Sequence, residues 1–159
     1  MDMIRTITED DLPAVAELAV TSELFPIEDV GVVEAMLGEF FAGRNAEGHT
    51  CVVDEVDGEL LAVAYYEPVT ATDRTWELVM IGVRRDRHRQ GRGGVVLRHV
   101  EDDLRDRGQR LLVVETSALP AFDRARAFYL ACDYDEEARV RDYFEAGDDM
   151  VLFRKLLQV

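Results

Sequence analysis

Basic residues are scarce in this chain of 159 residues: 18 Lys and Arg stand against 33 Asp and Glu, a formal net charge of −15. Lys155 is the only lysine. This excess of negative charge argues against nucleic acid, or an anionic membrane surface, as a partner of the protein as a whole. Any cluster of positive charge is therefore a local feature, and a local feature of that kind can concentrate an anionic ligand.

Long apolar runs and a cysteine framework are also missing. No segment reaches the ~18 uninterrupted apolar residues of a membrane span, and the first residues lack the regions of a signal peptide. Cys51 and Cys132 form no CxxC pair, so we expect two reduced thiols. His49, His88 and His99 lack the spacing of metal ligands, and no metal is expected. These absences favour a cytoplasmic location with no membrane partner.

The chain does contain enough apolar sequence for a core, with 48% of its residues apolar. We expect residues 1–159 to form a single domain. Hydrophobic periodicity and turn signals predict an α+β fold with a mixed sheet. Among the turn signals, Asp57-Gly58 predicts a hairpin between two strands, and Gly108 predicts a left-handed residue that ends a helix. Helices are expected from Asp10 or Asp11 onward and over 30–42, 92–107 and 121–131. Strands are expected over 3–6, 50–56, 59–67, 75–83, 110–116, 135–145 and 149–157.

The strand 78–83 leads into a segment rich in glycine and arginine, His88–Gly94, and then into an amphipathic helix. Apolar residues recur on this helix at the helical period: Gly93, Leu97, Val100 and Leu104. The apolar run 110–116 that follows is typical of a buried strand in a parallel pair. Strand, helix and strand therefore predict one parallel βαβ crossover.

The junction between this strand and helix has the features of a phosphate-binding site. A helix N-terminus offers unpaired backbone N–H groups and a partial positive charge. Gly91, Gly93 and Gly94 let an anion approach that backbone, and arginines add charge. The arginines are Arg84, Arg85, Arg87, Arg89 and Arg92. The spacing matches neither GxxxxGK[ST] nor GxGxxG; a solvated arginine-rich turn is the alternative.

The hexamer His88-Arg89-Gln90-Gly91-Arg92-Gly93 resembles the pyrophosphate loop of the GNAT superfamily of N-acetyltransferases, [QR]-x-x-G-x-[GA], with His at its first position. The order of the expected elements resembles that family too. The resemblance implies a mostly antiparallel sheet with one parallel crossover, flanked by helices, and acetyl-CoA as cosubstrate. It assigns the cofactor to the backbone of Ile81, Gly82 and Val83, to His88–Gly94 and to Tyr129.

Two further segments carry the resemblance. The helix Ala125–Tyr129 resembles the family's A-x-x-[FL]-Y segment, whose Tyr faces the thioester sulfur. Glu77, six residues before Val83, stands where some members have a general base. Phe122 departs from the usual Asn of this helix, and Asp133-Tyr134 departs from the usual Gly-Phe after it.

The chemistry requires these residue types, because an amine must lose its proton and a leaving thiolate must gain one. Glu77 is the first candidate base, with Glu115 at the carboxyl end of a parallel strand as competitor, and Tyr129 is the candidate acid. Tyr129 as a core residue and Glu77 as a solvated strand residue are the alternatives.

These observations predict an N-acetyltransferase that acts by direct attack of a primary amine, carried by a small molecule or a protein. The acidic surface favours a cationic acceptor. The alternative is a GNAT-fold acyl-CoA-binding or regulatory module without efficient transfer. A nucleic-acid-associated factor fits poorly with the charge, and the resemblance leaves a homodimer open.

Overall fold

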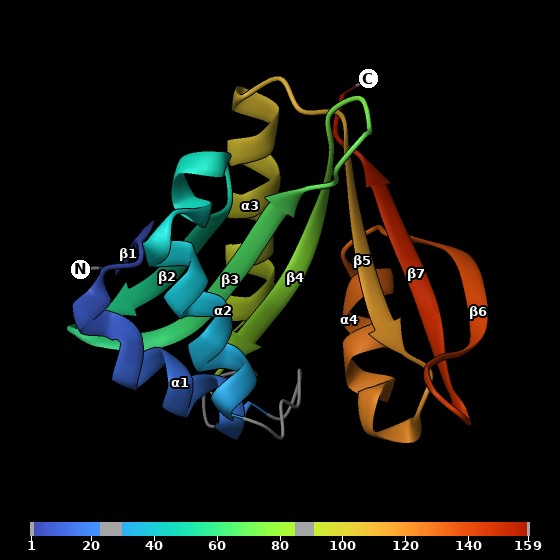
Figure 1. The fold of residues 1–159 in the computed structure, drawn as a ribbon, viewed down its shortest axis with the longest axis horizontal. Coiled ribbons are helices and arrows are strands. Elements are labelled where there is room, and N and C mark those ends of the chain that lie inside the picture. Colours follow the sequence, from blue (N-terminus) through green and yellow to red (C-terminus); the bar gives the residue numbers. More distant parts are fainter. Residues whose placement is uncertain (1, 23–29, 85–90, 159) are drawn as a thin grey trace.

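The computed structural model describes residues 2–22, 30–84 and 91–158, with the side chain of Asp2 excepted (Figure 1). One seven-stranded sheet forms its centre, in the order β1-β2-β3-β4-β5-β7-β6. The strands are β1 Asp2–Thr6, β2 Thr50–Val56, β3 Glu59–Pro68, β4 Thr75–Val83, β5 Leu111–Ser117, β6 Asp135–Glu145 and β7 Asp148–Leu156. All neighbours are antiparallel except β4 and β5, so the predicted mixed α+β sheet is confirmed.

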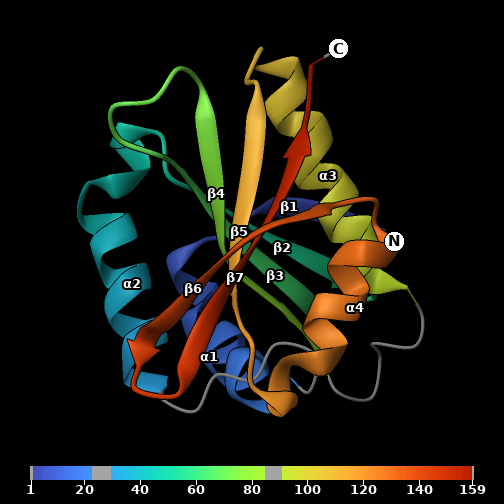
Figure 2. The same ribbon diagram turned by 90° about the vertical axis from the view of Figure 1, so that its right-hand side faces the viewer.

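Helices cover both faces of the sheet (Figure 2). One face carries α1 and α2, and the other carries α3 and α4. The helices are α1 Leu12–Thr21, α2 Val30–Ala42, α3 Arg92–Asp106 and α4 Asp123–Ala131, with short 3-10 turns η1 Glu9–Asp11, η2 Arg44–Glu47 and η4 Pro120–Phe122. The predicted helix over 121–131 is therefore split between η4 and α4. No helix among the described residues is long and apolar enough to cross a membrane.

Turn chemistry explains how two of these elements end. Asp57 and Gly58 join β2 to β3 with φ of 51° and 81°, the pair of positive values that a tight two-residue hairpin requires. Gly108 follows α3 with φ of 74°, where a left-handed residue ends a helix. Both turns were predicted from the sequence.

The two sheet faces have separate apolar cores. Tyr66, Leu78 and Phe153 belong to the core beneath α3 and α4. Tyr65 and Met80 belong to the core beneath α1 and α2. Consecutive residues of a strand point to opposite faces, so both tyrosines of β3 are buried, one in each core.

The parallel pair is short, and this shapes the rest of the molecule. β4 and β5 pair only where Thr75–Glu77 lies beside Leu111–Val113. Beyond Glu77, β4 continues beside β3, and β5 continues beside β7. The crossover is thus confirmed, but the segment 78–83 is not the part of β4 that pairs with β5. The two strands diverge, as the gap between their ribbons in Figure 1 indicates.

Candidate active site

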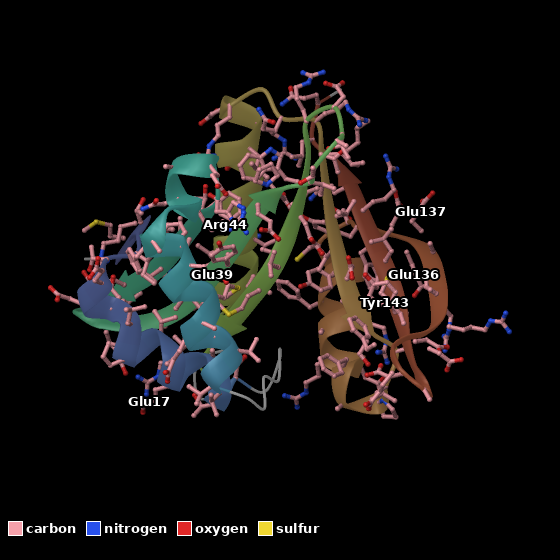
Figure 3. All side chains as sticks on the ribbon, in the orientation of Figure 1. Glu17, Glu39, Arg44, Glu136, Glu137 and Tyr143 are labelled. Atoms are coloured by element: carbon pink, nitrogen blue, oxygen red, sulfur yellow. The ribbon has the colours of Figure 1, made fainter. Side chains whose placement is uncertain are left out.

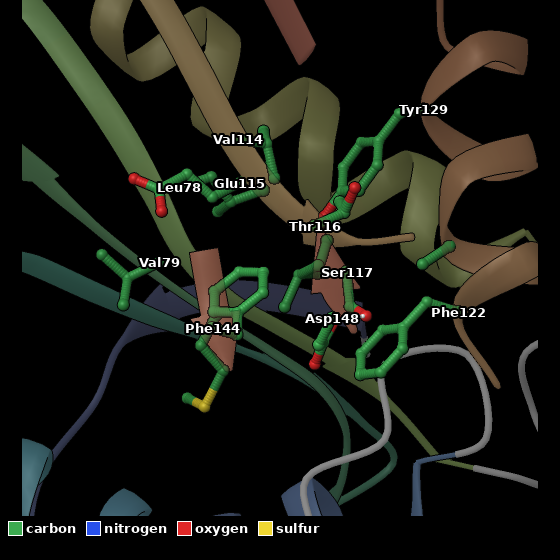
Figure 4. A pocket seen from close by; sticks show the side chains of 13 residues that line it. Leu78, Val79, Val114, Glu115, Thr116, Ser117, Phe122, Tyr129, Phe144 and Asp148 are labelled. Carbon is green, nitrogen blue, oxygen red and sulfur yellow. Dashed lines mark hydrogen bonds between the residues drawn. The ribbon is translucent and has the colours of Figure 1, made fainter. Parts of the chain in front are cut away.

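A cavity of about 320 Å³ begins where β4 and β5 part (Figure 4). Its walls come from both strands, from α4, from the turn before α4 and from the β6–β7 hairpin. The lining residues are Leu78, Val79, Met80, Ile81, Val114, Glu115, Thr116, Ser117, Phe122, Ala125, Tyr129, Phe144 and Asp148. Most of this surface is apolar, and its polar side chains are those of Glu115, Thr116, Ser117, Tyr129 and Asp148.

Tyr129 reaches this cavity from α4 and is 2% exposed. Its ring packs at 5.5 Å from Phe153 and at 5.8 Å from Tyr134, centroid to centroid, which fixes its orientation. Burial raises the pKa of the Tyr129 hydroxyl above its ordinary value. The phenol therefore stays protonated over the physiological pH range, as a proton donor must.

Glu77 and Glu115 lie together at the fork of the sheet, within hydrogen-bonding reach of each other. Glu77 is the last β4 residue paired with β5, and Glu115 lies two residues beyond its partner Val113. Burial, the hydrogen bond to Glu115 and the charge of Glu115 raise the pKa of Glu77 to about 7. The two carboxylates that the sequence offered as rivals are thus neighbours. Glu115 comes from β5, and Figure 4 shows its carboxylate directed away from Tyr129.

A second cavity, of about 420 Å³, lies on the α2 side of the fork. Three carboxylates line it: Glu39, Glu67 and Glu77. His49 Nδ1 lies 2.7 Å from the Tyr65 hydroxyl and 3.0 Å from Glu67 Oε2. Val79 lines both cavities, so the two meet at this residue.

The register of β4 explains the position of Val79. Met80 pairs with Tyr65 and Leu78 pairs with Tyr66, so Val79 is an extra residue without a partner in β3. Such a bulge bends the strand and redirects its side chains. It is located where β4 leaves β5.

The end of β4 directs backbone groups toward the open edge left by β5. Val83 donates its N–H to Ser22 Oγ at 3.3 Å, whereas Arg84 donates its N–H to Leu61 of β3. Backbone groups two residues apart point to the same edge of a strand. Ile81 therefore turns its N–H toward the open edge, while Gly82 faces β3.

The glycines at the start of α3 occupy three different structural environments. Gly91 has φ of 73°, in the left-handed region. A Cβ on Gly93 would lie 3.1 Å from Phe128 and 3.4 Å from Val83, so this glycine permits close packing inside the protein. A Cβ on Gly94 would meet only the flexible end of Arg98, at 3.3 Å. The sequence predicts Gly93 both on the apolar face of this helix and in the anion-binding turn, and its contacts with Phe128 and Val83 agree with the first of these.

Arg92, predicted to add charge to a phosphate site, directs its guanidinium to Asp54 instead. Nε and Nη2 donate to the two carboxylate oxygens of Asp54, each at 2.7 Å. The other predicted loop residues, His88, Arg89 and Gln90, lie outside the described residues.

A sequence model of the acetyltransferase (GNAT) family matches residues 7–134. The chain belongs to this family. No curated protein matches it. It is similar to a Desulfovibrio desulfuricans protein assigned to the GNAT acetyltransferases, with 28% identity, a TM-score of 0.91, and coverage of 99% of this chain and 100% of that chain.

Other acetyltransferases share the fold at lower identity. The ribosomal-protein-S18-alanine N-acetyltransferase of Escherichia coli has 24% identity and a TM-score of 0.77, covering 100% of this chain and 96% of that one. YncA of Salmonella typhimurium, whose structure contains acetyl-CoA as its cofactor, has 17% identity and a TM-score of 0.77, covering 100% of this chain and 95% of that one. This GNAT chain therefore has the GNAT fold.

Several residues that line this site were not predicted from the sequence. Tyr143 of β6 hydrogen-bonds Glu115, and this hydrogen bond raises the pKa of the Tyr143 hydroxyl. Phe144 lines the first cavity, and Glu67 faces the second. Figure 3 places Tyr143 on the β6 side of the molecule, and Glu39 on the α2 side. The available signal in the sequence was the pair of adjacent aromatic residues Tyr143-Phe144 within a segment rich in charged residues.

Proposed function

We propose that this protein transfers the acetyl group of acetyl-CoA to a primary amine by direct attack of that amine on the thioester. The observation that carries the proposal is the fork of β4 and β5. A buried, protonated tyrosine and Glu115 line the cavity there, and Glu77, the neighbour of Glu115, lines the adjoining α2-side cavity. Acyl transfer between a thioester and an amine needs one proton donor and one proton acceptor.

Tyr129 is proposed as the acid that protonates the leaving thiolate. The phenol hydroxyl is its only ionisable group, and burial keeps the proton on it. The contacts with Tyr134 and Phe153 hold the ring in one orientation. An oriented donor needs no rearrangement when charge develops on the sulfur.

Glu77 is proposed as the base that takes a proton from the attacking ammonium group. A general base works best with a pKa near the operating pH, and the pKa of Glu77 is raised to about 7. Glu115 supports this value through its hydrogen bond and charge. In this proposal Glu115 tunes Glu77, which lines the α2-side cavity from which an amine would approach.

The thioester itself is assigned to the open edge of β4. The N–H of Ile81 points to that edge and can donate to an acyl oxygen or an amide of the pantetheine arm. The first turn of α3, with Gly91 and Gly93, is assigned to the pyrophosphate. These residues fit acetyl-CoA, because the edge supplies donors beside an apolar cavity and the helix supplies its N-terminus.

The acceptor is proposed to be cationic. The α2-side cavity carries Glu39, Glu67 and Glu77, with Arg44 as the one arginine on its wall among the described residues. Carboxylates at the mouth of a site attract an ammonium group and raise its local concentration. A diamine or a lysine side chain fits this surface better than a neutral or acidic acceptor.

Release of free thiol from acetyl-CoA, measured across a panel of amines, tests the proposal. We expect turnover with at least one amine that carries a second positive charge, and slower turnover with a monoamine of the same length. CoA binding without thiol release on any amine would instead identify a binding or regulatory module. Absence of CoA binding would contradict the assignment altogether.

A further inference from the structure

Arg92 and Asp54 form a bidentate ion pair that joins two elements far apart in the sequence. Arg92 is the first residue of α3, and Asp54 lies in the middle of β2. The two hydrogen bonds, Nε to Oδ2 and Nη2 to Oδ1, are both 2.7 Å long. This fork-to-carboxylate geometry is the most directional that a guanidinium can make.

Burial makes the pair unlike the surface ion pairs of this protein. The side chain of Asp54 is 0% exposed and that of Arg92 is 17% exposed. A carboxylate taken out of water is costly unless a partner compensates it. Asp54 therefore needs the guanidinium of Arg92 in this place and holds it there.

The opposite side of the same helical turn is fixed by packing. Gly93 lies so close to Phe128 and Val83 that a Cβ would reach 3.1 Å and 3.4 Å from them. Val95 closes the turn by donating its N–H to the carbonyl of Gly91 at 3.1 Å. The first turn of α3 is thus held between β2 on one side and β4 with α4 on the other.

We propose that Arg92 and Asp54 are positioning residues for acetyl-CoA, in which the ion pair fixes the first turn of α3 while the guanidinium is not itself a phosphate ligand. The inference rests on the proposed function, because it assigns the pyrophosphate to the backbone N–H groups of this turn. An anchored turn presents those groups in one orientation, and groups held in their bound orientation lose less conformational freedom when the ligand binds, which strengthens binding.

The sign of the change in CoA affinity distinguishes an anchor from a ligand. Asp54→Asn keeps the shape of the side chain and removes its charge. If the pair is an anchor, the dissociation constant of CoA rises by about 10-fold, because the turn must then be ordered when CoA binds. If Arg92 is a phosphate ligand that Asp54 restrains, the same substitution releases positive charge toward the phosphates and CoA binds more tightly.

Arg92→Lys gives an independent test, because it keeps the positive charge and loses the two-pronged geometry. If the ion pair is an anchor, Arg92→Lys should bind CoA more weakly than the parent, with the same loss of affinity as Asp54→Asn. The double variant is expected to bind CoA no more weakly than either single variant, because both substitutions break the same ion pair. If Arg92 is a phosphate ligand, the Arg92→Lys variant should bind CoA almost as tightly as the parent.

Asp103→Asn is the matched control, because Asp103 accepts hydrogen bonds from Tyr66 and Arg107 at the other end of α3. Calorimetric titration of CoA, with urea unfolding of each variant, is the experiment. We expect weaker CoA binding in Asp54→Asn and Arg92→Lys and unchanged binding in Asp103→Asn. Unchanged or tighter binding in Asp54→Asn, or an equal loss in Asp103→Asn, overturns the inference. A parent protein that binds no CoA overturns the proposed function itself.

Discussion

The carboxyl groups of Glu77 and Glu115 meet at the point where β4 and β5 part. One carboxyl group alone at this position would not distinguish the site from an ordinary sheet edge. Together they place a group with a pKa of about 7 beside the cavity that Tyr129 lines. The same divergence of strands that opens the cavity thus also brings the two carboxyl groups together.

Glu77→Gln is expected to lower kcat/KM near neutral pH by about 10- to 100-fold, at the low end of general-base effects. Raising the pH should recover much of the loss, because solvent then deprotonates the amine. In the parent, the pH profile of kcat/KM should rise with a midpoint of about 7, since Glu77 must lose its proton to act. Initial rates across the pH range measure both effects.

Glu115→Gln is the paired variant. Removing the hydrogen bond and the charge of Glu115 lowers the pKa of Glu77, so the rising limb should move to lower pH. Burial of Glu77 persists, and it is the largest cause of the shift. If Glu115→Gln instead shows the loss that high pH recovers, and Glu77→Gln does not, Glu115 is the base.

The free energy of unfolding should depend on the protonation of Glu77. The pKa of Glu77 is about 7 in the folded protein, above the ordinary value of 4.5, so between these values the native state binds the proton more strongly than the unfolded chain. The free energy of unfolding of the parent, relative to Glu77→Gln, should therefore fall as pH rises from about 4.5 to about 7. Urea unfolding of both proteins at several pH values measures this difference. A constant difference would mean that Glu77 titrates as an ordinary carboxyl group.

Gly93 and Gly94 should respond differently to alanine, although they are adjacent in the first turn of α3. Alanine favours a helix over glycine by about 0.5–1 kcal/mol. At Gly94 its methyl group meets only the end of Arg98, so Gly94→Ala should be neutral or stabilising. At Gly93 the methyl group meets Phe128, so Gly93→Ala should be less stable than Gly94→Ala, and Gly93→Val should lose about 1–3 kcal/mol. Equal urea midpoints for the two alanine variants would contradict this packing.

Glu67 offers a test of the cationic acceptor. Glu67→Gln removes one charge from the α2-side cavity and leaves the first cavity, which it does not line, unchanged. We expect a higher KM for a diamine, a smaller change for a monoamine, and an unchanged dissociation constant for CoA. An equal rise in KM for both amines would indicate that the cavity does not recognise the second charge.

Local sequence signals were sufficient for most of the fold. The periodicity of residues 30–42 predicted α2 with its observed bounds, and Asp57-Gly58 predicted the hairpin between β2 and β3. These signals depend on neighbours in the chain, and tertiary packing agrees with them. The cavity depends on where β4 stops pairing with β5, a long-range feature that no local pattern encodes.

The candidate site was predictable in composition but not in arrangement. Tyr129 and the two carboxylates were named from the sequence, yet only the fold places Glu77 beside Glu115. Arg92 shows the same limit, because the sequence places it beside glycines at a predicted phosphate site, whereas its ion pair with Asp54 of β2 is visible only in the structure. Because Arg92 and Asp54 lie far apart in the sequence, no local pattern predicts that they pair.

Tyr129→Phe tests the central claim most directly, because it removes one hydroxyl group from a fully packed ring. Thiol release from acetyl-CoA with the best amine acceptor, measured together with CoA affinity, is the measurement. We expect kcat to fall by about 10²-fold or more, with the dissociation constant of CoA nearly unchanged. A variant as active as the parent would show that the hydroxyl of Tyr129 does not protonate the leaving thiolate, and that the residue belongs only to the core.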